Sequence, residues 1–336
     1  MTRVRPSLVL VGALLVALGA CADAAPDGAA ATQTDADAVR VVVTTAVLGD
    51  VVTQVLDGTG AEIEVVMPSG VDPHAYEPSA SDGLALREAD LVVANGLQLE
   101  TSLLDVLDAA ADDGVTVLEV GEQLDTLLEI GAEEPGHADG HGEAGERGDE
   151  DEGHDGHDHG ALDPHVWLDP LNVARMAEVI ATAYADVDEA ASETVTGNAA
   201  AVASDMEELD AELQALVATL DDDQRKLVTN HDSLGYLAAR YDLDVVGTVL
   251  PGASTDADTT AAAFTELVVT IREAGVPAIF ADTTASDRLA QSLAQEIGDI
   301  EVVRLHTGSL GEPGSGAESV SGMIRTNIER IVEALG

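Results

Sequence analysis

Cysteine and basic residues are scarce in this chain. Its 336 residues include a single cysteine, Cys21, so a disulfide within the chain is impossible. Lysine and arginine together number 14 against 64 aspartates and glutamates, which gives a formal net charge of −50 at pH 7. Nucleic acid binding is excluded, because no basic patch can be assembled here to neutralise phosphates. The acidity draws cations towards the surface but does not select a particular ion.

A membrane-spanning run is also missing at the start of the chain. Arg3 and Arg5 precede the apolar residues 8–18, and a helix needs about 20 apolar residues to cross a bilayer. We therefore predict that residues 1–20 are a secretory signal peptide. The ending LGAC resembles the bacterial lipobox, so Cys21 is expected to carry a lipid after cleavage.

From residue 39 onward, short β-branched runs alternate with amphipathic segments. Apolar runs of four to six residues, separated by helices of about ten, indicate parallel strands buried on both faces. The pattern occurs twice and predicts an α/β fold with two parallel-sheet lobes, residues 39–190 and 223–336. Residues 191–222 are rich in alanine and leucine and predict one long α-helix that joins the lobes. Residues 21–38 contain nothing that can pack and are expected to form a disordered tether.

A histidine-rich segment interrupts the first lobe at residues 137–160. It contains five histidines, seven glycines and nine acidic residues, so it is expected to be a disordered loop that cannot bury enough surface to fold. Flexible imidazoles among carboxylates bind zinc or similar ions loosely. We interpret the segment as an accessory metal-collecting loop, and a solvated low-complexity insert is the alternative. Its histidines are His137, His141, His154, His157 and His159.

Three other histidines lie at comparable places in the predicted fold. His74 follows the strand IEVVMP, His165 precedes a helix in ALDPHVWLDP, and His231 follows the strand KLVTN. Ligands of parallel α/β domains bind beyond the carboxyl ends of the strands, where loops converge. Three neutral imidazoles facing one gap are nitrogen donors suited to Zn²⁺. His306 also follows a strand, and we interpret it as a polar cap rather than a ligand.

The segments GVDPHAYEPS, DPHVWLDP and TNHDSLGYLAARY resemble the zinc and manganese substrate-binding lipoproteins of ABC importers. The resemblance extends from about residue 40 to the C-terminus. It implies two α/β lobes joined by one rigid helix, with the metal between them on His74, His165 and His231. Manganese members commonly have a carboxylate at the position of His231, so this histidine favours the zinc-specific branch.

The fourth ligand is left open by the sequence. Many members of that family place an aspartate after the last strand, where this chain has Gly308 in LHTGSLG. Water, Asp282, Glu318 or a histidine of the insert are the alternatives. We favour Asp282 because it too ends a predicted strand of the second lobe, while a capping or turn role for it is the competing interpretation.

The resemblance implies a transport function without catalysis. We expect an exported, monomeric protein, held by its lipid at the outer face of the cytoplasmic membrane, that passes Zn²⁺ to an ABC permease and its ATPase subunit. Mn²⁺ is a less favoured cargo. A zinc-storage or adhesion lipoprotein is an alternative. So is an exported zinc hydrolase, because three histidines with an open fourth position also describe a catalytic site.

Two further expectations concern how the metal is held and released. Capture needs deprotonated imidazoles, whose reference pKa is about 6.5, so the affinity is expected to fall as the medium acidifies through that value. The long helix is expected to limit hinge motion, so that release uses a local rearrangement of the metal loops.

Overall fold

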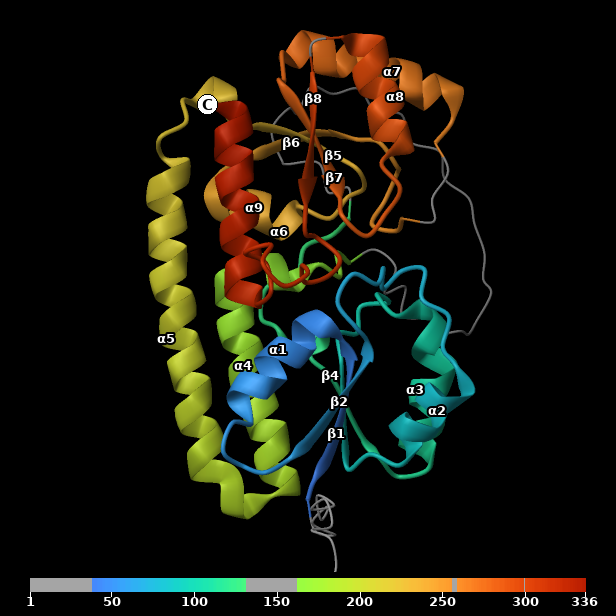
Figure 1. Cartoon of the computed structure of the whole chain (residues 1–336), viewed down its shortest axis with the longest axis vertical. Coiled ribbons are helices and arrows are strands. Elements are labelled where there is room, and N and C mark those ends of the chain that lie inside the picture. The colour runs from blue at the N-terminus through green and yellow to red at the C-terminus, as the bar shows by residue number, and fades with distance from the viewer. Residues whose placement is uncertain (1–37, 131–161, 256–258, 299) are drawn as a thin grey trace, which may run out of the picture. The chain divides into compact units, whose positions relative to one another are not determined.

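The computed structural model describes residues 38–130, 162–255, 259–298 and 300–336. The predicted signal peptide, Cys21, almost all of the tether and the five histidines of the insert lie outside these ranges. Ala38–Gly336 form one compact unit, and its described residues are drawn in colour in Figure 1.

The first lobe is built on a parallel sheet of four strands in the order β2-β1-β3-β4. Its strands are short and apolar, and the central strand β1 is buried along almost its whole length, as expected when helices cover both faces. The strands are β1 (Arg40–Thr45), β2 (Glu62–Met67), β3 (Leu91–Ala94) and β4 (Thr116–Glu119). The helices between them are α1 (Ala46–Val55), α2 (Ala80–Arg87) and α3 (Leu104–Asp112).

The second lobe repeats this topology with the strand order β6-β5-β7-β8, again all parallel. Its strands are β5 (Lys226–Thr229), β6 (Asp244–Thr248), β7 (Ala278–Asp282) and β8 (Glu301–Leu305). Its helices are α6 (Gly235–Tyr241), α7 (Ala261–Ala274), α8 (Arg288–Ile297) and α9 (Val320–Leu335). The prediction of two parallel-sheet α/β lobes is therefore confirmed.

The carboxyl ends of the two sheets face each other across the gap between the lobes, as the strand arrows of Figure 1 show. In each sheet the first strand in the chain, β1 or β5, is an inner strand. The second strand pairs with one side of it and the third strand with the other, so the connections on the two sides run in opposite directions at β1/β3 and at β5/β7. Loops diverge at such switch points and leave a crevice for a ligand. The topology thus provides one crevice from each lobe, and the two crevices open towards each other.

Two long helices pack against each other, and the second of them reaches both lobes. The α4 helix (Pro170–Val187) begins with residues typical of a helix N-terminus, with Asp169 as its N-cap and Pro170 in its first turn. The α5 helix (Ser192–Val217) has 26 residues, or about 39 Å at 1.5 Å per residue. It packs on α4 and α1 on the side of the first lobe and on α6 and α9 of the second, and it lies along both lobes in Figure 1.

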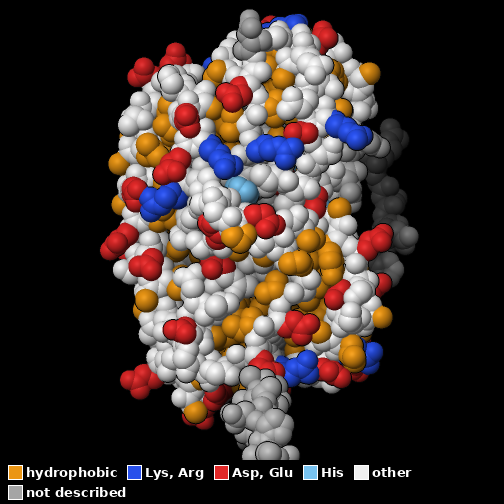
Figure 2. All heavy atoms as spheres, viewed as in Figure 1, with side chains coloured by type: hydrophobic (Ala, Val, Ile, Leu, Met, Phe, Trp, Pro, Cys, Tyr) orange, Lys and Arg blue, Asp and Glu red, His pale blue; other side chains and the backbone are white. Residues whose placement is uncertain are grey.

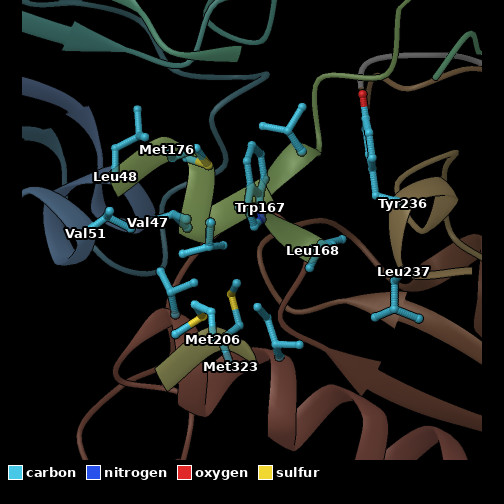
Figure 3. Packing of buried hydrophobic residues seen from close by; sticks show 14 of the residues in the cluster. Val47, Leu48, Val51, Trp167, Leu168, Met176, Met206, Tyr236, Leu237 and Met323 are labelled. Carbon is cyan, nitrogen blue, oxygen red and sulfur yellow. The ribbon is translucent and has the colours of Figure 1, made fainter. Parts of the chain in front are cut away.

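One hydrophobic cluster extends from one lobe into the other. Val41 and Val43 of β1 belong to the same buried cluster as Phe280 of β7, whereas Val42 points to the opposite face, where α2 and α3 cover the sheet. Figure 3 shows the middle of the shared cluster, where Trp167 lies among side chains of several helices. A rotation of one lobe against the other would therefore open this core to water.

Hydrogen bonds between the lobes add to the shared core. The carboxylate of Asp50 in α1 accepts a bond of 2.9 Å from the backbone nitrogen of Val320, at the start of α9. The backbone nitrogen of Gly70 donates to the hydroxyl of Ser309 at 3.0 Å. Both bonds join residues more than 200 positions apart in the sequence, so they close only when the two lobes are packed together.

Candidate metal centre

His74 lies in the loop after β2, at the edge of the gap between the lobes. Its backbone nitrogen donates to Oδ1 of Asp72 at 3.0 Å, and the other oxygen of Asp72 accepts a bond of 2.8 Å from Thr255 of the second lobe. The loop that carries His74 is therefore tied to both lobes. Its ring is only partly buried.

His165 comes from the segment that leads into α4, and its ring is completely buried. Oδ1 of Asp163 accepts from the backbone nitrogen of His165 at 2.9 Å and lies 2.8 Å from its Nδ1. A carboxylate at this distance makes Nδ1 the protonated nitrogen, which leaves the Nε2 lone pair free. The indole of Trp167 packs at 5.5 Å between ring centroids and donates to the carbonyl of Thr307 in the second lobe at 3.0 Å.

His231 follows β5, and its ring is also completely buried. Its neighbour Asn230 is fixed through the backbone, because its nitrogen donates to the carbonyl of Phe280 and its carbonyl accepts from Leu250, both at 2.8 Å. The Nδ1 atom of His231 has no hydrogen-bond partner among the residues that the structure describes. On the side of Nδ1, packing rather than hydrogen bonding therefore holds this ring.

The three Nε2 atoms point at one another. The Nε2 atoms of His74 and His165 lie 3.1 Å apart and those of His165 and His231 lie 3.3 Å apart, while all three candidate ligand atoms fall within 4.8 Å of one another. Two nitrogens bound at 2.0–2.1 Å to one tetrahedral zinc ion stand about 3.3–3.4 Å apart. The spacing of the rings therefore matches the size of one such ion.

Burial keeps the imidazoles of His74 and His231 neutral. It lowers the pKa of His74 to about 3, with a smaller contribution from the nearby His165. Burial also lowers the pKa of His231 well below the ordinary value, again helped by the neighbouring rings. Only a neutral imidazole offers a lone pair to a metal. Protons therefore compete with a metal for His74 and His231 at a lower pH than the reference value of about 6.5 implies.

Asp282 ends β7 as expected, but its carboxylate is engaged elsewhere. Oδ1 accepts from the backbone nitrogen and the hydroxyl of Thr284 at 2.7 and 2.8 Å, and Oδ2 accepts from the hydroxyl of Thr307. Its oxygens are not among the ligand atoms that cluster within 4.8 Å. The role of Asp282 as fourth ligand stays a prediction, and its bonds to Thr284 agree with the competing interpretation as a turn residue.

The other candidates lie apart from the three rings. Glu318 accepts from the backbone nitrogen of Gly314 inside its own loop. His306 is held by Asn327 through two backbone bonds of 2.8 Å, and its Nδ1 lies 3.2 Å from the hydroxyl of Thr283. A side chain at Gly308 would begin 3.2 Å from Oδ2 of Asp282 and 3.4 Å from Pro73, beside His74. The insert's histidines fall outside the described residues.

Sequence reasoning overlooked the aspartates that support the ligands. His74 and His165 both follow the dipeptide Asp-Pro, in VDPHAY and LDPHVW, and in both the aspartate Oδ1 accepts from the histidine backbone. The repeated Asp-Pro-His triplet was the available signal. It marks Asp72 and Asp163 as the residues that set the turns on which the two ligands stand.

A second group of residues that supports His165 was also overlooked, because its members lie far apart in the sequence. Glu100 is fully buried, and its carboxylate accepts from Thr44 at 2.6 Å and from the backbone nitrogen of Asn95 at 2.8 Å. Burial raises the pKa of Glu100. The amide of Asn95 donates in turn to the carbonyl of Pro164 at 3.0 Å. These bonds link the ends of β1 and β3 to the residue before His165.

The fold and the three converging imidazoles define a class of protein: two α/β lobes with a site between them, where three histidines are spaced to bind one cation. A model of the family of the zinc-uptake complex component A, a periplasmic protein, matches residues 41–334. The chain belongs to this family, so the family assignment made from the histidine motifs is confirmed.

Named relatives in this family differ in the metal. The manganese-binding lipoprotein MntA of Halalkalibacterium halodurans is 28% identical over 336 residues, which covers 100% of this chain and 99% of the relative. The zinc-binding lipoprotein AdcA of Streptococcus pneumoniae is 32% identical over 274 residues, covering 80% of this chain and 50% of that longer relative. The solved structure of the periplasmic zinc binding protein TroA from Treponema pallidum superposes with a TM-score of 0.73 at 26% identity, covering 89% of this chain and 99% of that one.

Proposed function

We propose that this chain captures a divalent cation on His74, His165 and His231 and delivers it to the permease and ATPase subunit of an ABC importer. The observation that carries the proposal is the spacing of 3.1 and 3.3 Å between the facing Nε2 atoms. Family membership supports the transport role, since one relative of Streptococcus cristatus is named a metal ABC transporter substrate-binding lipoprotein.

We propose Zn²⁺ as the preferred cargo. Three neutral imidazoles without a carboxylate among the clustered ligand atoms form a nitrogen-rich site, and imidazole suits zinc, whereas carboxylate and water suit manganese. The surface supports capture of any cation, because acidic side chains outnumber basic ones on the face shown in Figure 2. Selection must therefore come from the donor set rather than from the overall charge.

The proposal places the protein outside the cytoplasm, with a lipid on Cys21. Two relatives, MntA and AdcA, are named lipoproteins, which supports an anchor of this kind. Within the described residues, no helix has the length and apolar character needed to cross a membrane.

The packing supports release by a local change in the metal loops. The shared core and the α5 helix tie the lobes together, whereas the loop of His74 is held across the gap by few bonds, among them that between Thr255 and Asp72. Since breaking a few hydrogen bonds costs much less than exposing a core, we propose that the permease opens the site at this loop.

Metal analysis with competitive titration of Zn²⁺ against Mn²⁺ tests the proposal on the mature protein. One tight equivalent of Zn²⁺ is expected, and replacing His74, His165 or His231 by alanine should abolish it. His306→Ala is the matched control, because this histidine lies outside the cluster, and it should keep the tight site. Deletion of residues 137–160 should remove only weaker equivalents. Retention of the tight site in any of the three ligand variants would overturn the assignment.

A further inference from the structure

A pocket of about 200 Å³ reaches the metal centre from the side of His74. The rings of His165 and His231 are completely buried, whereas that of His74 is partly exposed. The imidazole of His74 lines the pocket. An ion arriving from solvent along this pocket would therefore meet His74 before it meets the other two rings.

The protein closes the opposite sides of the centre. Behind the ring of His165 stand Asp163, at 2.8 Å from Nδ1, and the buried indole of Trp167. Beside His231 in the chain, Asn230 and Ser233 are each exposed by only 1%. Among the residues that the structure describes, these buried side chains close the centre, so we take the side of His74 as the one where it exchanges with solvent.

The walls of the pocket come from both lobes and carry no charge. The first lobe contributes the polar Gln98 and Thr101 with the apolar Leu97, Ile130, Leu162 and Pro164, and the second contributes Ala253 and Ser254. Since one water occupies about 30 Å³ in the liquid, a pocket of this volume accommodates a cation with about six waters. Neutral oxygens stabilise such an ion in passing without holding it as a carboxylate would.

We propose that this pocket, lined by His74 and by neutral residues of both lobes, is the passage through which the hydrated cation enters and leaves the centre. The inference rests on the proposed function, because it concerns the same three histidines. During entry the imidazole nitrogens replace waters of the ion, and the displaced waters return to solvent along the pocket. No covalent bond changes other than this exchange of ligands.

The width of the pocket affects the activation barrier between the free and the bound ion, but not the free energies of these two states. A narrower pocket raises the barrier for binding and for release by the same amount, so both rate constants fall by the same factor and the affinity is unchanged. Replacing one of the metal-binding histidines has a different effect on the kinetics, since it mainly increases the rate constant for release and thereby weakens the affinity. The two effects are therefore separable by kinetics.

Ala253 is the place to narrow the pocket. It is partly buried in the wall contributed by the second lobe, and Ala253→Val and Ala253→Phe extend its side chain in two steps. Ala262→Phe is the matched control, because Ala262 lies on the exposed first turn of α7 in the same lobe. None of these changes adds a tryptophan, so Trp167, the single tryptophan of the chain, packed 5.5 Å from the ring of His165, can report binding.

Stopped-flow fluorescence with Zn²⁺ gives the binding rate, and transfer to a chromophoric chelator gives the release rate. Ala253→Phe is expected to lower both rate constants about tenfold and Ala253→Val less, with an affinity within about twofold of the parent and no change in the control. Unchanged rates in Ala253→Phe, or faster release with weaker binding, would overturn the passage. Should Ala253→Phe not fold, Ala253→Val decides between the same outcomes. Absence of a tight zinc equivalent in the parent would instead refute the proposed function.

Discussion

The loops that carry His165 and His231 place equally buried rings at the centre but support them differently. Behind His165, Asp163 accepts from Nδ1 at 2.8 Å, whereas Nδ1 of His231 has no hydrogen-bond partner among the described residues. A carboxylate behind a metal-binding imidazole fixes its tautomer and makes Nε2 a stronger donor. The difference teaches that the first lobe supplies a preorganised ligand, while the second supplies one that is held by packing alone.

Removing the carboxylate should produce the largest loss. We expect Asp163→Ala to weaken zinc binding about 100-fold, because the ring of His165 loses both its tautomer and its orientation. Competitive titration against a zinc chelator measures this. Asp188→Ala is the matched control, since Asp188 also accepts a backbone bond in a local turn but stands at the exposed junction before α5. An affinity within threefold of the parent for Asp163→Ala would show that both loops are held by packing.

Acidification should lower the free energy of unfolding of the metal-free protein through the two histidines that are kept neutral. The pKa of His74 is lowered to about 3 and that of His231 well below its usual value, so the unfolded chain binds more protons than the folded one once the pH falls below about 6.5. The contribution of these two rings to the stability of the metal-free protein is therefore complete above about pH 6.5 and is lost progressively as the pH falls towards about 3. Each ring contributes up to about 1.4 kcal/mol per pH unit in this window.

Urea unfolding of the metal-free protein between pH 7 and pH 4 measures this dependence. His231→Asn should reduce the slope of stability against pH, because one proton-linked group is removed. His306→Asn serves for comparison, since burial lowers the pKa of His306 less far. An identical slope in the parent and in His231→Asn would contradict the neutral state assigned to this ring.

The helix packed behind Asp163 offers a smaller perturbation. A Cβ atom at Gly235, at the start of α6, would lie 2.7 Å from Oδ2 of Asp163, so Gly235→Ala must displace this carboxylate. We expect zinc binding to weaken about tenfold, less than in Asp163→Ala. Gly197→Ala is the control, because nothing lies within 4 Å of a Cβ there and α5 should gain about 0.5–1 kcal/mol. An unchanged zinc affinity in Gly235→Ala would contradict this prediction, because it would show that α6 moves and the carboxylate of Asp163 stays in place.

The smallest effect is expected behind His231. The hydroxyl of Ser233 is buried and has no hydrogen-bond partner among the described residues, so Ser233→Ala should leave zinc affinity within about twofold and should not destabilise the fold. Titration and thermal unfolding check both points. A loss as large as that of Asp163→Ala would show that Ser233 supports His231 in solution, and the contrast between the loops would disappear.

Much of the fold could be predicted because it depends on local patterns. The run RVVVTT became β1, the Asp169-Pro170 pair became the start of α4, and the alanine-rich segment became α5. The three ring-bearing loops were also found, because each adjoins a recognisable strand or helix. Glu100 and its link through Asn95 to Pro164 were not found, since a bond between residues 69 positions apart leaves no local pattern.

By itself, the sequence determined the repeated strand and helix order, the family and the three histidines, because periodicity and short motifs are local properties of a chain. Only the tertiary structure decided that Asp163 stands behind the ring of His165, whereas Nδ1 of His231 has no hydrogen-bond partner among the described residues. It also decided that Asp282 is engaged by Thr284 and Thr307 and that His74 faces the pocket. These features arise when two lobes bury a common core, and burial and partner geometry are properties of the packed whole.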